Sequence, residues 1–345
     1  MESRPQTAEV DGRTPPAVPP AIVVRGLAKS FAEVEAVRGV DFEVAPGEVF
    51  GFLGPNGAGK STTINMLCTL LRPSAGSATV AGHDVVRERD DVRRNIGLVF
   101  QDPTVDSYLT AEQNLRLHAE LYGVEVAVVR PRMRQVLEMV GLWERRDSPV
   151  RTFSGGMRRR LEIARGLMHS PRVLFLDEPT IGLDPQTRRS IWSYIRLLKE
   201  NEDITIFMTT HYMDEAELCD RIAIMDQGEI VALDSPEALK ARVAADRVQI
   251  ETEDDEAAIA AIAERFGLAA TIVEDAVTFS VPSGEQFVPR LFAELEVPIR
   301  AVRVSRPTLD DVFMSYTGTT IRDAEESHAR QANRMVMQAF AGAGR

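Results

Sequence analysis

Residues 54–62 have the sequence Gly54-Pro55-Asn56-Gly57-Ala58-Gly59-Lys60-Ser61-Thr62, which fits the pattern G-x-x-x-x-G-K-S/T. The apolar residues 49–53 before this loop predict a short buried strand, and the apolar spacing across residues 62–71 predicts a helix after it. Glycines let successive backbone N–H groups turn toward one anion, and a helix N-terminus adds the positive end of its dipole. This segment, called the phosphate loop below, is therefore expected to bind the phosphates of a nucleotide.

Two side chains of the phosphate loop carry chemistry of their own. Lys60 can reach the β- and γ-phosphates of a bound nucleotide, and the Ser61 hydroxyl can ligate Mg²⁺. The alternative is a glycine-rich turn that only caps a helix. The predicted order of strand, loop and helix favours the nucleotide site.

A second segment, Val173-Leu174-Phe175-Leu176-Asp177-Glu178, is an apolar run that ends in two carboxylates. A strand next to the one that precedes the phosphate loop would bring Asp177 to Mg²⁺, directly or through water. Glu178 would then lie nearer the γ-phosphate, where a carboxylate can orient and activate the attacking water. Two acids after a strand can also cap a helix, and taken alone the two interpretations are equally good. The presence of the phosphate loop favours the catalytic one.

A third segment, Phe153-Ser154-Gly155-Gly156-Met157-Arg158, opens a predicted helix that continues to Leu167. Ser154 is suited to cap the helix, and the two glycines allow close backbone approach, which makes a second helix N-terminus suited to phosphate. Because the chain has a single lysine-bearing loop, we expect Ser154-Gly155-Gly156, called the signature segment below, to serve the nucleotide of a neighbouring molecule. The alternative is a plain capped helix, which needs no pair of glycines.

In their order along the chain, these segments resemble the nucleotide-binding subunits of ATP-binding cassette (ABC) transporters over residues 21–240. The resemblance implies ATP and Mg²⁺ as cofactors and gives roles to four more residues. Phe31 would stack on the adenine, Gln101 would touch Mg²⁺, water and the permease, and Asp184 would lie in the family's D-loop. His211 would contact the γ-phosphate. A lone histidine or glutamine after a strand is usually structural, but both positions agree here with the other motifs.

The predicted site therefore has three sets of residues. The catalytic residues are Lys60, Glu178 and His211. The metal-binding residues are Ser61, Gln101 and Asp177. The nucleotide-contacting residues are Phe31, Gly54, Pro55, Asn56, Gly57, Ala58, Gly59, Lys60, Ser61, Thr62, Gln101, Ser154, Gly155, Gly156 and Asp184.

The end of the chain narrows the resemblance. Arg306-Pro307-Thr308-Leu309-Asp310-Asp311-Val312-Phe313 resembles the end of an extension found on drug-export ATPases of the daunorubicin-resistance type. This implies two copies of the chain that sandwich ATP, a separate multi-span permease, and export of a drug, an antibiotic or a lipid-like compound. A second hypothesis is a non-transport cassette acting on ribosomes or DNA, which the single cassette and the lack of room for a long coiled coil disfavour. A third, compatible hypothesis makes the C-terminal part a small-molecule sensor.

The length of 345 residues predicts a large domain and a smaller one. For the first we expect an α/β fold of the P-loop NTPase class and ABC type, with a mixed sheet, a small antiparallel β-subdomain and a helical subdomain. For the second, the periodicity predicts the order β-α-β-β-α-β, which is ferredoxin-like. The predicted divisions are a disordered leader 1–20, a nucleotide-binding domain 21–240, an accessory domain 246–316 and a tail 317–345.

Composition limits the function further. The formal net charge is −12, which argues against nucleic acid as a partner. The two cysteines cannot form a disulfide framework, which suits a reducing cytosol. No apolar run reaches the roughly 18 residues of a membrane span. We therefore expect a peripheral protein at the cytoplasmic face of the membrane, where another chain supplies the span.

Overall fold

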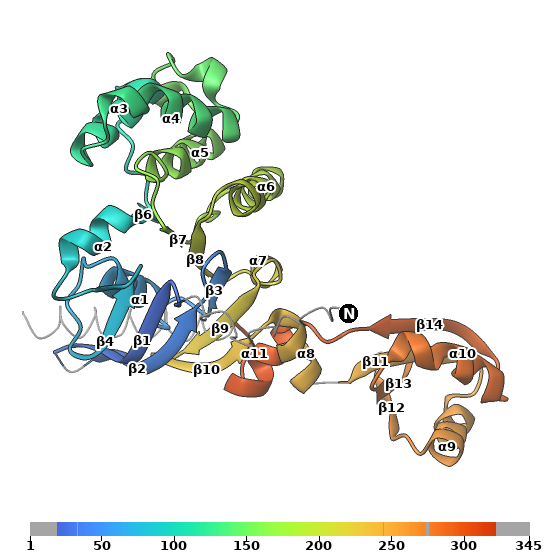
Figure 1. Cartoon of the computed structure of the whole chain (residues 1–345). Coiled ribbons are helices and arrows are strands. Elements are labelled where there is room, and N and C mark those ends of the chain that lie inside the picture. Colours follow the sequence, from blue (N-terminus) through green and yellow to red (C-terminus); the bar gives the residue numbers. More distant parts are fainter. Residues whose placement is uncertain (1–18, 33, 244, 274–275, 322–345) are drawn as a thin grey trace, which may run out of the picture.

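The computed structural model describes residues 19–321 apart from residues 33, 244 and 274–275 (Figure 1). Most of the predicted leader, and the predicted tail from residue 322 onward, lie outside the described residues. In the part that is described, no helix is long and apolar enough to cross a membrane.

The phosphate loop follows one strand of a central sheet with the strand order β10-β9-β3-β8-β7-β6. Its strands are β3 (Val49–Leu53), β6 (Ile96–Val99), β7 (Val173–Asp177), β8 (Thr205–Thr210), β9 (Arg221–Asp226) and β10 (Glu229–Asp234). β10 is antiparallel and the others are parallel, so the sheet is mixed, as predicted. Every residue of β3, β7 and β8 is buried, which explains why these strands are continuous apolar runs. Since β3, β7 and β8 are parallel neighbours, their carboxyl ends meet at one edge.

An antiparallel subdomain with the order β2-β1-β4-β5 covers part of the cassette. Its strands are β1 (Ile22–Phe31), β2 (Val34–Val44), β4 (Ala75–Val80) and β5 (His83–Asp84). The subdomain is confirmed, but it also takes two strands from after the phosphate loop, which was not predicted. β1 and β2 pair along most of their length through several register shifts, which hide the regular alternation of a strand. Phe31 is the last residue of β1.

The predicted helical insertion is present between β6 and β7. It comprises α3 (Ala111–Leu121), α4 (Val126–Met139), the short 3₁₀ helices η1 (Trp143–Arg145) and η2 (Val150–Thr152), and α5 (Gly155–Gly166). Figure 1 shows α3, α4 and α5 gathered away from the sheets. The other helices of the cassette are α1 (Lys60–Leu67), α2 (Arg89–Asn95), α6 (Pro185–Asn201), α7 (Met213–Ala216) and α8 (Pro236–Val243). α1 is shorter than predicted because Thr69, with φ 64°, ends the helical path soon after it.

The C-terminal part has its own antiparallel sheet, in the order β12-β13-β11-β14. Its elements are β11 (Asp246–Thr252), α9 (Asp255–Phe266), β12 (Ala270–Val273), β13 (Ala276–Val281), α10 (Gly284–Glu294) and β14 (Ile299–Ser305). The order β-α-β-β-α-β is as predicted. A separate buried cluster, with Val248, Phe279 and Leu291 among its members, forms its core.

The last described helix, α11 (Leu309–Thr317), returns to the cassette. Its Val312 and Phe313 are fully buried in the same cluster as Leu239 of α8, and Figure 1 shows the two helices side by side. The predicted end of the nucleotide-binding domain at residue 240 falls inside α8. The Ser235 hydroxyl accepts the amide of Ala238, 3.2 Å away, and so caps the start of α8. Within the motif at residues 306–313, Leu309, Val312 and Phe313 pack in the core of the cassette, whereas Arg306 pairs with Glu285 of α10.

Candidate functional site

The phosphate loop passes from β3 into α1 through positions where only glycine fits. Gly59 has φ 107°, and a Cβ there would lie 2.5 Å from the carbonyl oxygen of Ala36. A Cβ on Gly54 would lie 2.2 Å from the carbonyl oxygen of Met225. Lys60 begins α1 and is buried, and its Nζ donates to the carbonyl oxygens of Gly54 (2.7 Å) and Pro55 (3.0 Å). The lysine charge is thereby held over the mouth of the loop.

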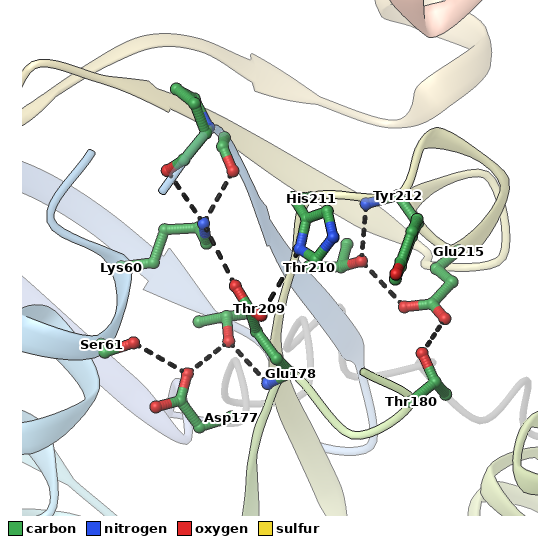
Figure 2. A network of polar contacts seen from close by, with 12 residues as sticks. Lys60, Ser61, Asp177, Glu178, Thr180, Thr209, Thr210, His211, Tyr212 and Glu215 are labelled. Atoms are coloured by element: carbon green, nitrogen blue, oxygen red, sulfur yellow. Dashed lines mark hydrogen bonds and ion pairs between the residues drawn. The ribbon is translucent and has the colours of Figure 1, made fainter. Parts of the chain in front are cut away.

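Asp177, at the end of β7, meets the first turn of α1. Its Oδ1 accepts hydrogen bonds from the Ser61 hydroxyl (3.1 Å) and the Thr209 hydroxyl (2.6 Å), as Figure 2 shows. A serine hydroxyl and a carboxylate side by side are oxygen ligands of the kind that Mg²⁺ takes. These residues therefore fit a magnesium ion.

Glu178 lies between two basic side chains. Its Oε1 is 3.5 Å from Nζ of Lys60, and its Oε2 is 3.4 Å from Nδ1 of His211 (Figure 2). Burial by itself would raise the pKa of this carboxyl, but the contact with His211 and the charge of Lys60 outweigh it, and the pKa lies below the usual value. Glu178 is therefore ionised at neutral pH, as a base that accepts a proton from water must be.

The pair of Glu178 and His211 has unused hydrogen-bonding capacity. Oε2 of Glu178 and Nδ1 of His211 are both buried, and neither makes a hydrogen bond of ordinary geometry with another described residue. Buried polar atoms of this kind are rare in folded proteins and call for a role. A water molecule beside the pair could donate to Oε2 of Glu178, and Nδ1 of His211 could bond to that water or to a phosphate oxygen.

The backbone of Glu178 is held in an unusual conformation. Its φ is 45°, in the left-handed region that non-glycine residues rarely adopt. Its amide N–H donates to the Thr209 hydroxyl at 2.9 Å, and that same hydroxyl donates to Asp177. One threonine at the end of β8 thus fixes both acids of the site.

The signature segment opens α5 as predicted. Ser154 caps the helix, since its hydroxyl accepts the amide of Met157 at 3.2 Å. Ser154 and Gly155 are exposed, whereas Gly156 is buried against α6. A Cβ on Gly156 would lie 2.3 Å from Cγ2 of Thr187, but one on Gly155 would meet nothing closer than 3.7 Å. The close approach that Gly156 permits is therefore packing of α5 on α6, which the sequence did not indicate.

This difference gives a matched pair of variants. We expect Gly156→Ala to lower the free energy of unfolding by about 1–3 kcal/mol, because the added methyl overpacks the contact with Thr187. Gly155→Ala adds the same methyl at an open position, so its effect on stability should be within about 0.5 kcal/mol. Chemical denaturation of both variants checks this. Equal stability of the two variants would contradict the packing role of Gly156.

Other predicted residues lie apart from this cluster. Phe31 is 47% exposed, with Nζ of Lys29 5.0 Å from the centre of its ring, so a face of the ring is open to stacking partners. Gln101 is exposed after β6 and lines a cavity with Gly155. Asp184 caps α6 and accepts the amides of Gln186 and Thr187, each at 3.0 Å. Among the described residues, the hydrogen bonds of the Asp184 side chain are local to the first turn of α6.

Arg159 was not singled out from the sequence, although it is buried at the centre of the site's framework. Its guanidinium donates to the backbone oxygens of Pro179 (2.6 Å), Asp177 (3.1 Å) and Glu178 (3.2 Å), and also to that of Phe100. It therefore joins the segment before Gln101 to the end of β7. It also pairs with the carboxylate of Glu162, 3.2 Å away and three residues on along α5. Nothing in the run of three arginines at 158–160 distinguishes Arg159, because its other partners are backbone oxygens distant in the sequence.

The site combines a glycine loop that holds a buried lysine with two acids from the neighbouring strand and a histidine against the second acid. The helical insertion ends in a helix that opens on Ser-Gly-Gly. Together these features define an ATP-binding cassette. Comparison with known proteins agrees. The family model "ABC transporter" matches residues 37–181, and the model "ATP-binding protein DrrA1-3-like, C-terminal domain" matches residues 235–317.

The similar proteins include the daunorubicin/doxorubicin resistance ATP-binding protein DrrA of Streptomyces peucetius, 40% identical over 92% of this chain and 98% of that protein. The linearmycin resistance ATP-binding protein LnrL of Bacillus subtilis is 38% identical over 86% of this chain and 98% of its own length. A dimeric, post-hydrolysis structure of an ATP-binding cassette bound to ADP and Pi is 27% identical, with a TM-score of 0.56, over 62% of this chain and 98% of that one. The chain belongs to the family of ABC transporter ATP-binding proteins, within the daunorubicin-resistance (DrrA) type. It is an ATPase whose hydrolysis of ATP drives transport.

Proposed function

We propose that this chain powers the export of a drug or antibiotic through a separate membrane permease, at the cytoplasmic face of the membrane. The observation that carries the proposal is the 40% identity to a daunorubicin/doxorubicin resistance protein over 92% of the chain. That similarity includes the C-terminal extension, for which the DrrA-like family model matches residues 235–317. A likeness limited to the cassette would point to ATP use alone.

In this proposal the phosphate loop holds the nucleotide. Backbone N–H groups of the loop and the Lys60 ammonium bind the phosphates, and Phe31 stacks on the adenine. Ser61 and Asp177 hold Mg²⁺, with Gln101 as a further ligand from its loop. The ion supplies charge neutralisation for the phosphates that separate.

Glu178 and His211 act on the reacting end. Glu178 orients the attacking water and takes its proton, which its ionised state allows. His211 lies against the same carboxylate and is placed to contact the γ-phosphate. The contribution of the site is positioning and charge stabilisation, which is what phosphoryl transfer requires.

A second copy of the chain would complete each site. Ser154 and Gly155 are exposed at the start of α5. In a head-to-tail dimer this helix N-terminus would meet the phosphates held by the partner. Dimeric cassettes among the similar structures support this arrangement. Asp184, exposed at the start of α6, would face the same interface.

We further propose that the C-terminal sheet and its two helices form a ferredoxin-like unit. Its support is the strand order β12-β13-β11-β14 with every neighbouring pair antiparallel. That order, together with β-α-β-β-α-β, is the arrangement that the name describes.

Export is tested in cells that carry the full-length chain together with the membrane protein that co-purifies with it. We expect cells loaded with daunorubicin to lose its fluorescence faster with the wild-type chain than with Glu178→Gln. The matched variant leaves the complex assembled and removes only hydrolysis. Equal retention of daunorubicin, and equal sensitivity to linearmycin, in the two strains would contradict drug export. Co-purification with ribosomes in place of a membrane protein would contradict it as well.

A further inference from the structure

Two successive threonines end β8, and their side chains point to opposite sides of the strand, as the period of a strand requires. Thr209 serves Asp177 and Glu178. The Thr210 hydroxyl instead accepts the amide of Tyr212 at 2.9 Å and donates to Oε2 of Glu215 at 2.8 Å (Figure 2). The second threonine therefore connects the strand to a residue that the mechanism above does not use.

Glu215 is 1% exposed, in the short helix α7. Its Oε1 accepts the Thr180 hydroxyl, while its Oε2 accepts the Thr210 hydroxyl. Nε of Arg188 lies 3.7 Å from Oε1. Both carboxylate oxygens are thus engaged by hydroxyl donors, with one guanidinium nearby as the opposite charge.

Each partner of Glu215 belongs to a segment that carries a residue of the site. Thr180 lies two residues after Glu178, at the start of the loop that leads to Asp184. Thr210 immediately precedes His211, and its backbone oxygen accepts the amide of Gly54, the first residue of the phosphate loop, at 3.3 Å. The buried carboxylate therefore joins the loop after Glu178 to the end of β8, and the backbone of Thr210 in turn contacts the phosphate loop.

The aromatic ring after His211 adds a further link. The guanidinium of Arg188, on α6, lies 3.9 Å from the ring centre of Tyr212, and the rings of Tyr212 and His211 are 4.0 Å apart. Arg188 thus contacts both Glu215 and the residue that packs on His211. The segment around His211 is therefore held by the hydrogen bond between Thr210 and the amide of Tyr212, and by the contact of the Tyr212 ring with the His211 ring.

Burying a carboxylate is costly unless it is hydrogen-bonded and paired. Burial raises the pKa of Glu215, while the two threonine hydroxyls and Arg188 act in the opposite direction. A leucine or methionine would fill the space at a smaller desolvation cost. Unlike these side chains, a carboxylate provides two acceptor oxygens at a fixed separation, and each binds a hydroxyl from a different loop.

We propose that Glu215 is a positioning residue for ATP hydrolysis, which sets the His211 loop and the loop after Glu178 in register through Thr210 and Thr180. The proposal rests on the catalytic roles given above to Glu178 and His211. Glu215 does not touch the reacting atoms. It sets the position of His211 relative to Glu178, and it sets the path of the backbone from Glu178 toward Asp184.

The test compares substitutions that keep or remove the two hydroxyl bonds, in the purified full-length chain. Displacing a reacting group by about 1 Å costs on the order of a hundredfold in rate. We therefore expect Glu215→Ala, and the Thr180→Val/Thr210→Val double variant, to lower kcat by roughly ten- to a hundredfold. ATP affinity should stay within about twofold, because Lys60 and the phosphate loop are intact. Thr180→Ser and Thr210→Ser keep the hydroxyls and should retain kcat within about twofold.

Two controls separate positioning from general damage. Glu217→Gln changes an acid on the same segment that pairs with Lys240 and contacts neither loop, so it should leave kcat unchanged. Thr180→Val in the Glu215→Ala background should cost nothing further, because the Thr180 hydroxyl acts through that carboxylate. Glu215→Gln, which can still accept one hydroxyl, should lie between the wild type and Glu215→Ala.

The outcomes distinguish this inference from the proposed site. If Glu178→Gln abolishes hydrolysis but Glu215→Ala and the valine pair do not lower kcat, the positioning role is wrong and the site stands. If the serine variants lose as much rate as the valine variants, the hydroxyl bonds are not the cause and the positioning role is wrong. If Glu178→Gln retains full hydrolysis, the assigned site itself is wrong.

Discussion

Glu178→Gln is expected to lower kcat for ATP hydrolysis by about 10²- to 10⁴-fold, the contribution typical of a positioned general base. Glutamine has the same shape and can still contact Lys60 and His211, so the architecture of the site should persist. It cannot accept a proton from water. ATP affinity should therefore change little while turnover is lost, and single-turnover kinetics together with an equilibrium binding measurement check both halves of the prediction.

An acid elsewhere on the chain provides the control for Glu178→Gln. Glu138, on α4, is exposed and pairs with Arg134, so Glu138→Gln should hydrolyse ATP at the wild-type rate. Because the pKa of Glu178 lies below its usual value, this carboxylate remains ionised down to acidic pH. The rate should not fall on its account between pH 8 and about pH 5. Wild-type turnover by Glu178→Gln would remove Glu178 from its assigned role.

Lys60→Ala is expected to weaken ATP binding by about a hundredfold or more, because each hydrogen bond to a charged group contributes about 1.5–3 kcal/mol and the lysine can reach two phosphates. The substitution also removes the ammonium group that lies 3.5 Å from the buried carboxylate of Glu178. The uncompensated negative charge of Glu178 would then repel the phosphates of ATP more strongly. Titration with a fluorescent ATP analogue measures the loss.

Lys199→Ala serves as the control for Lys60→Ala. Lys199 pairs with Asp220 at 2.6 Å on the exposed surface, outside the phosphate loop. Addition of ATP should raise the melting temperature of the control as it does that of the wild type, since a ligand that binds only the folded state stabilises it. Lys60→Ala should show no such rise. A full rise would mean that the nucleotide is held elsewhere.

The parts of the site that could be predicted from sequence are those whose chemistry is local. The phosphate loop, the acids after β7 and the cap of α5 each consist of neighbouring residues, and the structure places them as predicted. The apolar runs of β3, β7 and β8 are visible because both faces of these strands are buried. The roles of all the predicted site residues, including Phe31, Gln101 and Asp184, remain predictions.

The features that the sequence did not reveal depend on contacts between distant residues. Besides its pair with Glu162, Arg159 binds backbone oxygens, which leave no pattern in the sequence. Thr209 bonds to Asp177 and Glu178, and Glu215 to Thr180, across 31–35 residues. The sequence suggests that Gly156 lets the backbone approach a phosphate, but the atom that a Cβ at this position would clash with belongs to Thr187. The packing of α11 on the cassette could not be predicted, because the sequence of an amphipathic helix shows which face is apolar but not which surface that face packs against.

The central claim is that the phosphate loop of one copy and the signature segment of another make one ATP site, and mixing two inactive variants tests it most directly. Lys60→Ala disables the loop, and Gly155→Asp places a carboxylate where the partner's phosphates would lie. Gly155 is exposed, so this change leaves its own fold intact.

We predict that each variant alone is inactive, and that an equimolar mixture which exchanges subunits recovers roughly a quarter of wild-type ATPase activity, because half of the dimers then carry one intact site of two. The absence of any recovery in exchanged dimers, or full activity of Gly155→Asp alone, would contradict the shared site.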